Sequence, residues 1–503
     1  MSDRKNVLLI TSDQQHWFTL GVQNPEVKTP NLDRLAKKGT LFNRAYTVNP
    51  TCTPTRASII TGQYPSQHGA YSLGTKLPED VPCVGDYMQK AGYRTALIGK
   101  AHFQQLLDHP QWRSIESNPL QQNLDFWREF NGPFYGFDHV ELCRNHADEY
   151  HVGQHYALWM EEKGFTQWRE CFNRPGGTNG PQYLSWNIPE EYHYDTFIAE
   201  RSIAMLEEFH AQGRPFFLWS SFLDPHPPYL VPKPWDTMYD PASLTIPEGR
   251  DGEHAKNPKH IQLTQQENPD FSEYNEPEGH SLHGLSEQWR GRDKLPERIA
   301  VYYGMISLMD KYIGKILDKL EELGLEEDTV ICFSTDHGHF YGHHNLCAKG
   351  PFHYEDAVKL PFLVSCPGTV PAGETSDAMQ SLVDLAPTFM GFAGLDKPRM
   401  MAGVDQSPVW RGESEAARDH VLVQNRHNPY KMFHNTYIDE RYKITVYCHS
   451  DEGELFDLQE DPGEFNNLWD NPDAAELKSQ LLLRYIRADM AKDPVPMPRV
   501  WGA

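Results

Sequence analysis

A cysteine and an arginine stand close together in the segment of residues 52–65, CTPTRASIITGQYP. A thiolate that attacks a phosphate uses such a pair, with the arginine neutralising the anion. Enzymes of that kind separate the two residues more widely, whereas only three residues lie between Cys52 and Arg56. Pro54 also lacks the backbone N–H that a phosphate cradle needs. The spacing disfavours a plain thiolate nucleophile, and a buried, inert cysteine before a helix is the simplest alternative.

Two acids follow apolar runs that have the character of buried strands. Asp13 ends NVLLITSD, and Asp336 follows VICFST. If both strands are parallel in one sheet, both acids emerge at its carboxyl edge, where their charges repel unless a cation lies between them. Gln14 and His337 directly follow the acids and could complete the shell. A metal site is therefore predicted, although a lone Asp more often caps a helix or turn.

Four further polar residues could face an anion: Lys100 and His102 in GKAHF, His226 in DPHPPY, and Lys349 in AKGPFHYED. Taken singly, a lysine is usually solvated and a histidine is usually a surface or core residue. Their order along the chain, together with Cys52, favours a functional interpretation.

The elements that must position these residues are strands alternating with helices. Strands are expected within residues 6–13, 92–100, 214–222 and 328–338, and helices within residues 29–42 and 299–323. This alternation predicts an α/β fold, a large mostly parallel sheet sandwiched by helices. After residue 395 the pattern changes to short strands and one helix, which predicts a smaller C-terminal antiparallel α+β subdomain.

We expect a catalytic α/β domain over residues 1–395 and the subdomain over residues 396–503. Two irregular stretches, at about residues 103–192 and 231–297, are interpreted as insertions that shape a pocket rim or an oligomer contact. Aromatic side chains of the first stretch could stack on a substrate ring or lie in a subunit contact: Trp112, Trp127, Tyr150, Trp159, Trp168 and Trp186.

Composition limits the partners. The formal charge of the 503-residue chain is −24 without a basic block, which argues against nucleic acid and requires a local positive field at any anion site. The eight cysteines form no CxxC pair, and we find neither a signal-peptide pattern nor an apolar run long enough for a membrane span. We therefore expect a cytoplasmic, membrane-free protein with reduced thiols.

Residues 52–65 resemble the signature of the formylglycine-dependent sulfatases of the alkaline phosphatase superfamily. The matching residues are Cys52, Pro54, Arg56, Thr61 and Gly62. The resemblance implies that a separate formylglycine-generating enzyme oxidises Cys52 to an aldehyde. Residues 381–395 resemble the family's late helix, and residues 453–468 resemble its C-terminal strand and turn. The resemblance therefore runs from about residue 6 to residue 468 and implies an alkaline-phosphatase-like fold.

The resemblance also implies a metal centre. Asp13, Gln14, Asp336 and His337 fall at the family's ligand positions, and the oxygen of modified Cys52 would add a ligand. Calcium is expected because most of the ligands are oxygens, and manganese is the alternative because one is an imidazole nitrogen. His339, His343 and His344 match no family position and are interpreted as loop residues.

By the same resemblance, Arg56, Lys100 and Lys349 hold the sulfate and the nucleophile. His226 protonates the leaving alcohol, and His102 accepts the remaining proton of the hydrated aldehyde. The implied reaction is hydrolysis of a small-molecule sulfate ester.

Two alternatives remain open. One is a phosphonate monoester or phosphodiester hydrolase of the same superfamily, although Lys100 and His102 are more typical of sulfatases. The other is a non-catalytic protein that binds an anion or a metal and in which Cys52 is never oxidised. The long insertions are also compatible with a homo-oligomer.

Overall fold

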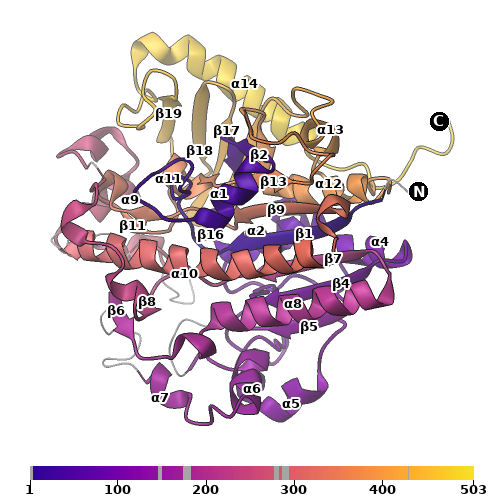
Figure 1. Cartoon of the computed structure of the whole chain (residues 1–503). Helices are drawn as coiled ribbons and strands as arrows, with labels where there is room; N and C mark the ends of the chain where they lie inside the picture. Colours follow the sequence, from indigo (N-terminus) through magenta and orange to yellow (C-terminus); the bar gives the residue numbers. More distant parts are fainter. Residues whose placement is uncertain are drawn as a thin grey trace.

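The structure is a computed structural model that describes residues 4–144, 150–173, 183–247, 249–276, 283–285, 294–428 and 430–502. Its centre is an eight-stranded sheet in the order β14-β2-β13-β9-β1-β7-β4-β5 (Figure 1). The strands are β14 (Glu374–Ser376), β2 (Thr40–Phe42), β13 (Leu363–Ser365), β9 (Thr329–Thr335), β1 (Asn6–Ser12), β7 (Phe216–Ser221), β4 (Arg94–Gly99) and β5 (His139–Leu142). From β9 to β5 all neighbours are parallel, whereas β13 runs antiparallel to β9 and β2.

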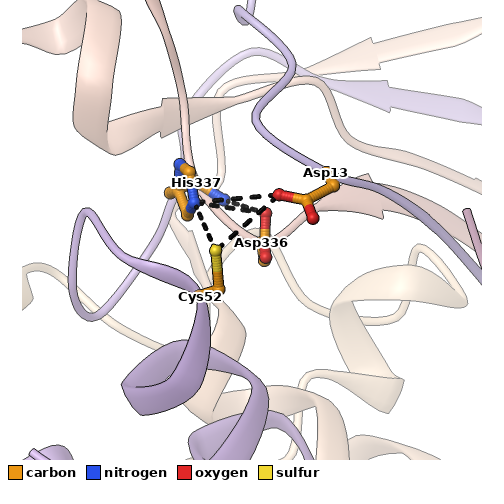
Figure 2. A group of neighbouring side chains, drawn as sticks. All are labelled: Asp13, Cys52, Asp336 and His337. Atoms are coloured by element: carbon orange, nitrogen blue, oxygen red, sulfur yellow. Dashed lines mark hydrogen bonds and ion pairs between the residues drawn. The ribbon is translucent and has the colours of Figure 1, made fainter. Parts of the chain in front are cut away.

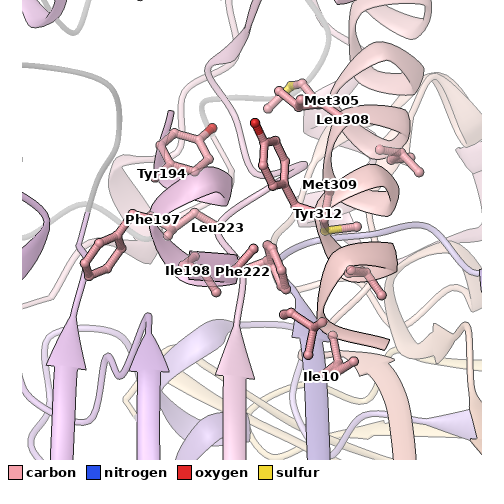
Figure 3. Close-up of a cluster of buried hydrophobic side chains, with 14 of the residues drawn as sticks. Ile10, Tyr194, Phe197, Ile198, Phe222, Leu223, Met305, Leu308, Met309 and Tyr312 are labelled. Carbon is pink, nitrogen blue, oxygen red and sulfur yellow. The ribbon is translucent and has the colours of Figure 1, made fainter. Parts of the chain in front are cut away.

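Both faces of the sheet are covered by helices, as a parallel sheet requires. Leu8 and Ile10 of β1 face a core formed with α1 (Pro30–Lys37), α8 (Tyr194–Gln212) and α10 (Leu295–Glu322). Figure 3 shows part of this core, where side chains from α8 and α10 meet above the strands. Val7 and Leu9 point the other way, toward α2 (Cys52–Thr61), α4 (Val84–Lys90) and α12 (Leu385–Phe392). The α/β sandwich expected from the sequence is confirmed.

Short elements complete the larger part of the molecule. The helices are α3 (Pro65–His68), α5 (Leu124–Glu129), α6 (Gln154–Glu162), α7 (Arg169–Phe172), α9 (Lys259–Thr264), α11 (Glu355–Val358) and α13 (Ser407–Trp410). The strands form small sheets or ribbons and are β3 (Ala45–Tyr46), β6 (Tyr183–Trp186), β8 (Tyr229–Pro232), β10 (Phe340–Tyr341), β11 (Cys347–Ala348), β12 (Lys359–Leu360) and β15 (Gln380–Ser381).

The first irregular stretch, residues 103–192, differs from the expected rim insertion. It contributes β5, the edge strand of the main sheet, which pairs with β4 from Ala96↔His139 to Gly99↔Leu142. Of the six aromatic side chains considered for substrate stacking, four are buried, namely Trp127, Trp159, Trp168 and Trp186. Only Trp112 and Tyr150 of the six are exposed. Substrate stacking is therefore excluded for the four buried rings.

The C-terminal part is an antiparallel sheet covered by one long helix, at the top of Figure 1. It consists of β16 (Val421–Asn428), β17 (Met432–Ile438), β18 (Tyr442–Tyr447), β19 (Gly453–Asp457) and α14 (Ala475–Ala491). Leu422, Ile444 and Leu455 pack under Leu481 of α14, which forms a separate small core. The antiparallel α+β subdomain is confirmed.

Two general expectations can be compared with the structure. All eight cysteines are free thiols. None of the helices in the described ranges has the length and apolar character that a membrane span needs.

Candidate active site

The two strand-end acids lie side by side at the carboxyl edge of the sheet. Asp13 directly follows β1 and Asp336 directly follows β9, and these parallel strands are in register at Ser12↔Thr335. Both carboxylates are completely buried. Figure 2 shows them converging on one point together with Cys52 and His337. The ligand atoms of these four residues all lie within 4.8 Å of one another.

Cys52 reaches this point because it is the first residue of α2. The positive end of the helix dipole favours negative charge on its sulfur. The sulfur lies 3.2 Å from Nε2 of His337 and 3.8 Å from Oδ1 of Asp13. Thr47 fixes the approach of α2 because its hydroxyl donates to the carbonyl of Asp336 at 2.8 Å.

Arg56, one turn along α2, is a buried bridge beneath the acids. Its Nε donates to Oδ2 of Asp336 at 2.8 Å, and its Nη2 lies 3.8 Å from Oδ2 of Asp13. Its Nη1 donates to the carbonyl of Lys100 and to the hydroxyl of Ser221. The guanidinium therefore forms ion pairs with both carboxylates and, through the carbonyl of Lys100, fixes the backbone of that residue.

Two ammonium groups flank the sulfur of Cys52. Lys100 forms an ion pair with Asp13 and lies 3.7 Å from the sulfur. Lys349 lies 3.1 Å from the sulfur, 3.1 Å from Nε2 of His226 and 3.2 Å from Nε2 of His337. The chain thus creates the local positive field that its net charge of −24 otherwise denies to an anion.

This field changes the protonation of the buried groups. Burial raises the pKa of Asp13, but the positive charges of Lys100, Arg56 and Lys349 outweigh burial and hold that pKa well below the ordinary carboxyl value. Burial and the charge of Asp13 raise the pKa of the Cys52 thiol. The charges of Lys100 and Lys349 lower this pKa by a larger amount, so the net pKa falls below that of a free thiol. The site therefore stabilises an anionic oxygen or sulfur at the position of Cys52.

The residues present fit a divalent cation. His337 donates from Nδ1 to the carbonyl of Gly338 at 3.0 Å, which leaves a lone pair on Nε2, 3.7 Å from Asp336 and 3.9 Å from Asp13. Oε1 of Gln14 is buried and has no hydrogen-bond partner within the described residues. Two carboxylates and one imidazole nitrogen therefore meet at one buried point, and the oxygen of Gln14, the residue after Asp13, is a further candidate ligand.

The two remaining histidines have different surroundings. His226 has Nδ1 2.5 Å from the carbonyl of Pro227, so this nitrogen carries the proton and Nε2 accepts from Lys349. Burial, and then the charge of Lys349, lower the pKa of His226 well below its ordinary value. Within the described residues, no hydrogen bond or ion pair joins His102 to the cluster. Both of its ring nitrogens are buried without partners there.

His102 is nevertheless held within electrostatic range of the cluster. Burial and then the charge of Lys100 lower the pKa of His102 well below 6.5. Its backbone φ is 56°, in the left-handed region, and the carboxylate of Glu116 accepts N–H groups from residues 102–104 at 2.7–2.9 Å. Sequence analysis missed Glu116 because an acid in an irregular segment gives no signal of such a role.

His339 is a second residue whose position sequence analysis did not anticipate. Its Nδ1 lies 2.8 Å from Nε2 of the Gln14 side chain, and its Nε2 lies 2.7 Å from the hydroxyl of Tyr229. The only available signal was its place two residues after His337. His343 and His344 instead lie beside Asp356, at 3.3 and 3.6 Å.

The fold and the site together define an alkaline-phosphatase-like hydrolase of the sulfatase branch. A family model described as Sulfatase matches residues 5–395, and one described as N-sulphoglucosamine sulphohydrolase, C-terminal, matches residues 342–490. The chain therefore belongs to the sulfatase family and is a sulfuric ester hydrolase. This confirms the resemblance derived from residues 52–65.

Similar proteins agree with this assignment. The chain is 29% identical to the multifunctional alkaline phosphatase superfamily protein PehA of Trinickia caryophylli, over 94% of this chain and 93% of that protein. It is 28% identical to an arylsulfatase of Clostridium perfringens, over 92% and 90% of the two chains. Among solved structures, a phosphonate monoester hydrolase from Silicibacter pomeroyi superposes with a TM-score of 0.79 at 26% identity, covering 98% and 96% of the two chains.

Proposed function

We propose that this sulfatase hydrolyses sulfate monoesters of an aryl, sugar or small alcohol through an aldehyde formed on Cys52. The observation that carries the proposal is the position of the Cys52 sulfur, 3.1 Å from the ammonium of Lys349 and 3.7 Å from that of Lys100. A sulfate next to the nucleophile would meet both cations. Similar proteins named arylsulfatase, N-acetylglucosamine-6-O-sulfatase and choline-sulfatase support this range of alcohols without selecting one.

The proposal includes one divalent metal held by Asp13, Gln14, Asp336 and His337, with the oxygen of modified Cys52 as a further ligand. Calcium is favoured because oxygen ligands predominate, and manganese is the alternative because of the imidazole. When bound, the metal lowers the pKa of the attacking hydroxyl and offsets the developing negative charge.

The side chains divide the remaining work. The hydrated aldehyde of Cys52, produced by a formylglycine-generating enzyme, supplies the hydroxyl that attacks sulfur as the bond to the alcohol oxygen breaks. Lys100 and Lys349 bind sulfate oxygens whose charge rearranges in the transition state. Arg56 pairs with both carboxylates and fixes the backbone that carries Lys100. His102 accepts the second hydroxyl proton, which releases sulfate and restores the aldehyde.

Protonation of the leaving alcohol is assigned to His226 acting with Lys349. Since Nδ1 of His226 donates to Pro227, the proton must pass through Nε2, which faces the ammonium of Lys349 at 3.1 Å. Because the low pKa of His226 leaves Nε2 without a proton at rest, the proton that reaches the alkoxide through Nε2 must start on the ammonium of Lys349, which regains a proton from solvent after the products leave.

A second candidate is hydrolysis of phosphonate monoesters or phosphodiesters. Two solved phosphonate monoester hydrolases support it, with TM-scores of 0.79 and 0.78 at 26% and 25% identity. Comparative kcat/KM values on an aryl sulfate and the matching aryl phosphonate separate the two. Faster sulfate turnover supports the first candidate, and faster phosphonate turnover supports the second.

A protein with an unmodified Cys52 that cleaves neither ester would instead be a non-catalytic anion- or metal-binding protein. Rates must therefore be measured on protein from cells that contain the formylglycine-generating enzyme.

A further inference from the structure

Gln14 is held in an uncommon backbone conformation. Its φ is 62°, in the left-handed region that few non-glycine residues adopt. Its N–H donates to Oδ1 of Asp336 at 3.2 Å, and its carbonyl accepts from the hydroxyl of Tyr302 at 3.0 Å. Both ends of the peptide are therefore fixed, which directs the side chain of Gln14 independently of any bound ligand.

The two ends of the Gln14 amide have different environments. Nε2 lies 2.8 Å from Nδ1 of His339. Oε1 is buried and lacks a hydrogen-bond partner within the described residues. A half-turn of the amide would exchange the two atoms at little cost unless a neighbour distinguishes a donor from an acceptor. His339 is the neighbour that can do so.

The tautomer of His339 decides which end of the amide faces it. Nδ1 also lies 3.0 Å from the carbonyl of Ala348, and Nε2 lies 2.7 Å from the hydroxyl of Tyr229. A neutral imidazole carries one ring proton. With the proton on Nε2, the ring donates to Tyr229 and Nδ1 accepts from Gln14. With the proton on Nδ1, the ring donates to the carbonyl of Ala348, and the N–H groups of His339 and of the Gln14 side chain face and repel each other.

We propose that His339 is a positioning residue for the metal site: its Nδ1 accepts from Nε2 of Gln14 and so turns Oε1 of Gln14 toward the metal. Tyr229 holds the required tautomer by accepting from Nε2. This inference rests on the proposed function only in that Gln14 is a metal ligand. It concerns metal affinity and is independent of the oxidation of Cys52.

The test is a competition titration of the chelator-treated full chain with Mn²⁺ and with Ca²⁺ against an indicator dye. H339A should bind the metal about 10- to 100-fold more weakly, as for loss of an outer-shell partner. H339N should bind close to wild type because its amide oxygen can accept from Gln14. Y229F should weaken binding in the same direction, since loss of its hydroxyl favours the other tautomer.

A matched control is H353A, which removes another buried histidine that bonds to Thr436 rather than to Gln14. Q14A should weaken binding, and adding H339A to Q14A should cause no further loss, because the two residues act as a unit. Thermal unfolding in the presence of chelator measures any general loss of stability separately.

The outcomes are distinguishable. If wild type binds the metal and H339A binds equally tightly, or if H353A loses as much affinity as H339A, the inference is wrong while the proposed function stands. If wild type binds neither ion and D13A changes nothing, the metal site of the proposed function fails as well. If H339A does not fold, Y229F and H339N decide: wild-type affinity in Y229F, or an H339N affinity as low as that of Q14A, overturns the inference.

Discussion

Two clusters of the same residue types lie near the carboxyl edge of the sheet, and only one is suited to a metal. The first contains Asp13, Asp336 and His337, and the second contains His16, His343 and Asp356. In the first, Nδ1 of His337 donates to a backbone carbonyl, which leaves a lone pair on Nε2. In the second, Nδ1 of His16 accepts from the N–H of Phe18 at 3.1 Å, so Nε2 carries the proton and donates to Asp356 at 2.8 Å.

The difference shows that one backbone hydrogen bond determines whether an imidazole offers a lone pair or a proton. The second cluster is already satisfied: Asp356 accepts from His16, lies near His343 and His344, and its backbone carbonyl accepts from the N–H of His339. It therefore joins the segments after β1 and β9 to α11. In the first cluster, the two carboxylates and the lone pair of His337 face one point, and the groups that neutralise them there include the ammonium ions of Lys100 and Lys349.

The largest expected effect is on turnover through Cys52. C52A should lower kcat for an aryl sulfate by at least about 10⁴-fold because it removes the nucleophile, with little change in the unfolding midpoint. Steady-state rates and urea denaturation measure the two quantities. Undiminished turnover by C52A would remove the basis of the mechanism.

Loss of one cation of the first cluster comes next. K349A should lower kcat about 10²- to 10³-fold, since it removes a group that stabilises charge in the transition state. The matched control is K359A, whose ammonium lies over the ring of Trp17, 4.0 Å from its centroid, beside the second cluster. Equal losses of kcat in the two variants would mean that Lys349 acts only through general electrostatics or folding.

The metal content of two variants should show which cluster binds the metal. Dialysis against a chelator should abolish turnover by wild type, and Ca²⁺ or Mn²⁺ should restore it. D336N should lose bound metal measured by elemental analysis, because a buried carboxylate ligand becomes a neutral amide. D356N should retain wild-type metal content, and a loss of metal in D356N would show that the second cluster also binds an ion.

The stability of the second cluster is a separate expectation. D356N should lower the free energy of unfolding by about 1–3 kcal/mol, because the protonated Nε2 of His16 loses a buried charged acceptor. Urea denaturation measures this change. An unchanged midpoint would show that the bond between His16 and Asp356 makes no net contribution.

The last expectation concerns the pH dependence of stability and a third cluster, His193, Asp195 and Asp224, which has no cation among its members. Burial raises the pKa of Asp224 to about 7. The native state therefore keeps a proton on Asp224 that the unfolded chain loses near pH 4, so the contribution of Asp224 to native stability falls as pH rises from about 4 to 7. D224N should remove the part of the pH dependence that Asp224 causes, which is at most about 1.4 kcal/mol per pH unit. The free energy of unfolding is measured by urea denaturation from pH 5 to 8. The same pH dependence in wild type and D224N would contradict this expectation.

Sequence analysis predicted those parts of the molecule that leave a local signal. Continuous apolar runs marked β1 and β9, and the residues after them, Asp13 and Asp336, are brought together by the sheet as expected. Strand β5 was missed because it has only four residues within an irregular stretch.

The supporting contacts could not be predicted because they depend on residues far apart in the chain. The bond between Gln14 and His339 spans 325 positions, and the direction of the His337 hydrogen bond is set by local backbone geometry. Sequence patterns identify candidate ligands, whereas only the folded chain determines which nitrogen or oxygen each one presents.

The most direct test of the central claim is the mass of the peptide that carries Cys52, measured on protein that turns over an aryl sulfate. The account predicts a peptide in which the thiol is replaced by an aldehyde or its hydrate. An unmodified thiol in fully active protein would contradict the account, because the sulfur of Cys52, rather than an aldehyde hydrate, would then be the nucleophile beside Lys100 and Lys349.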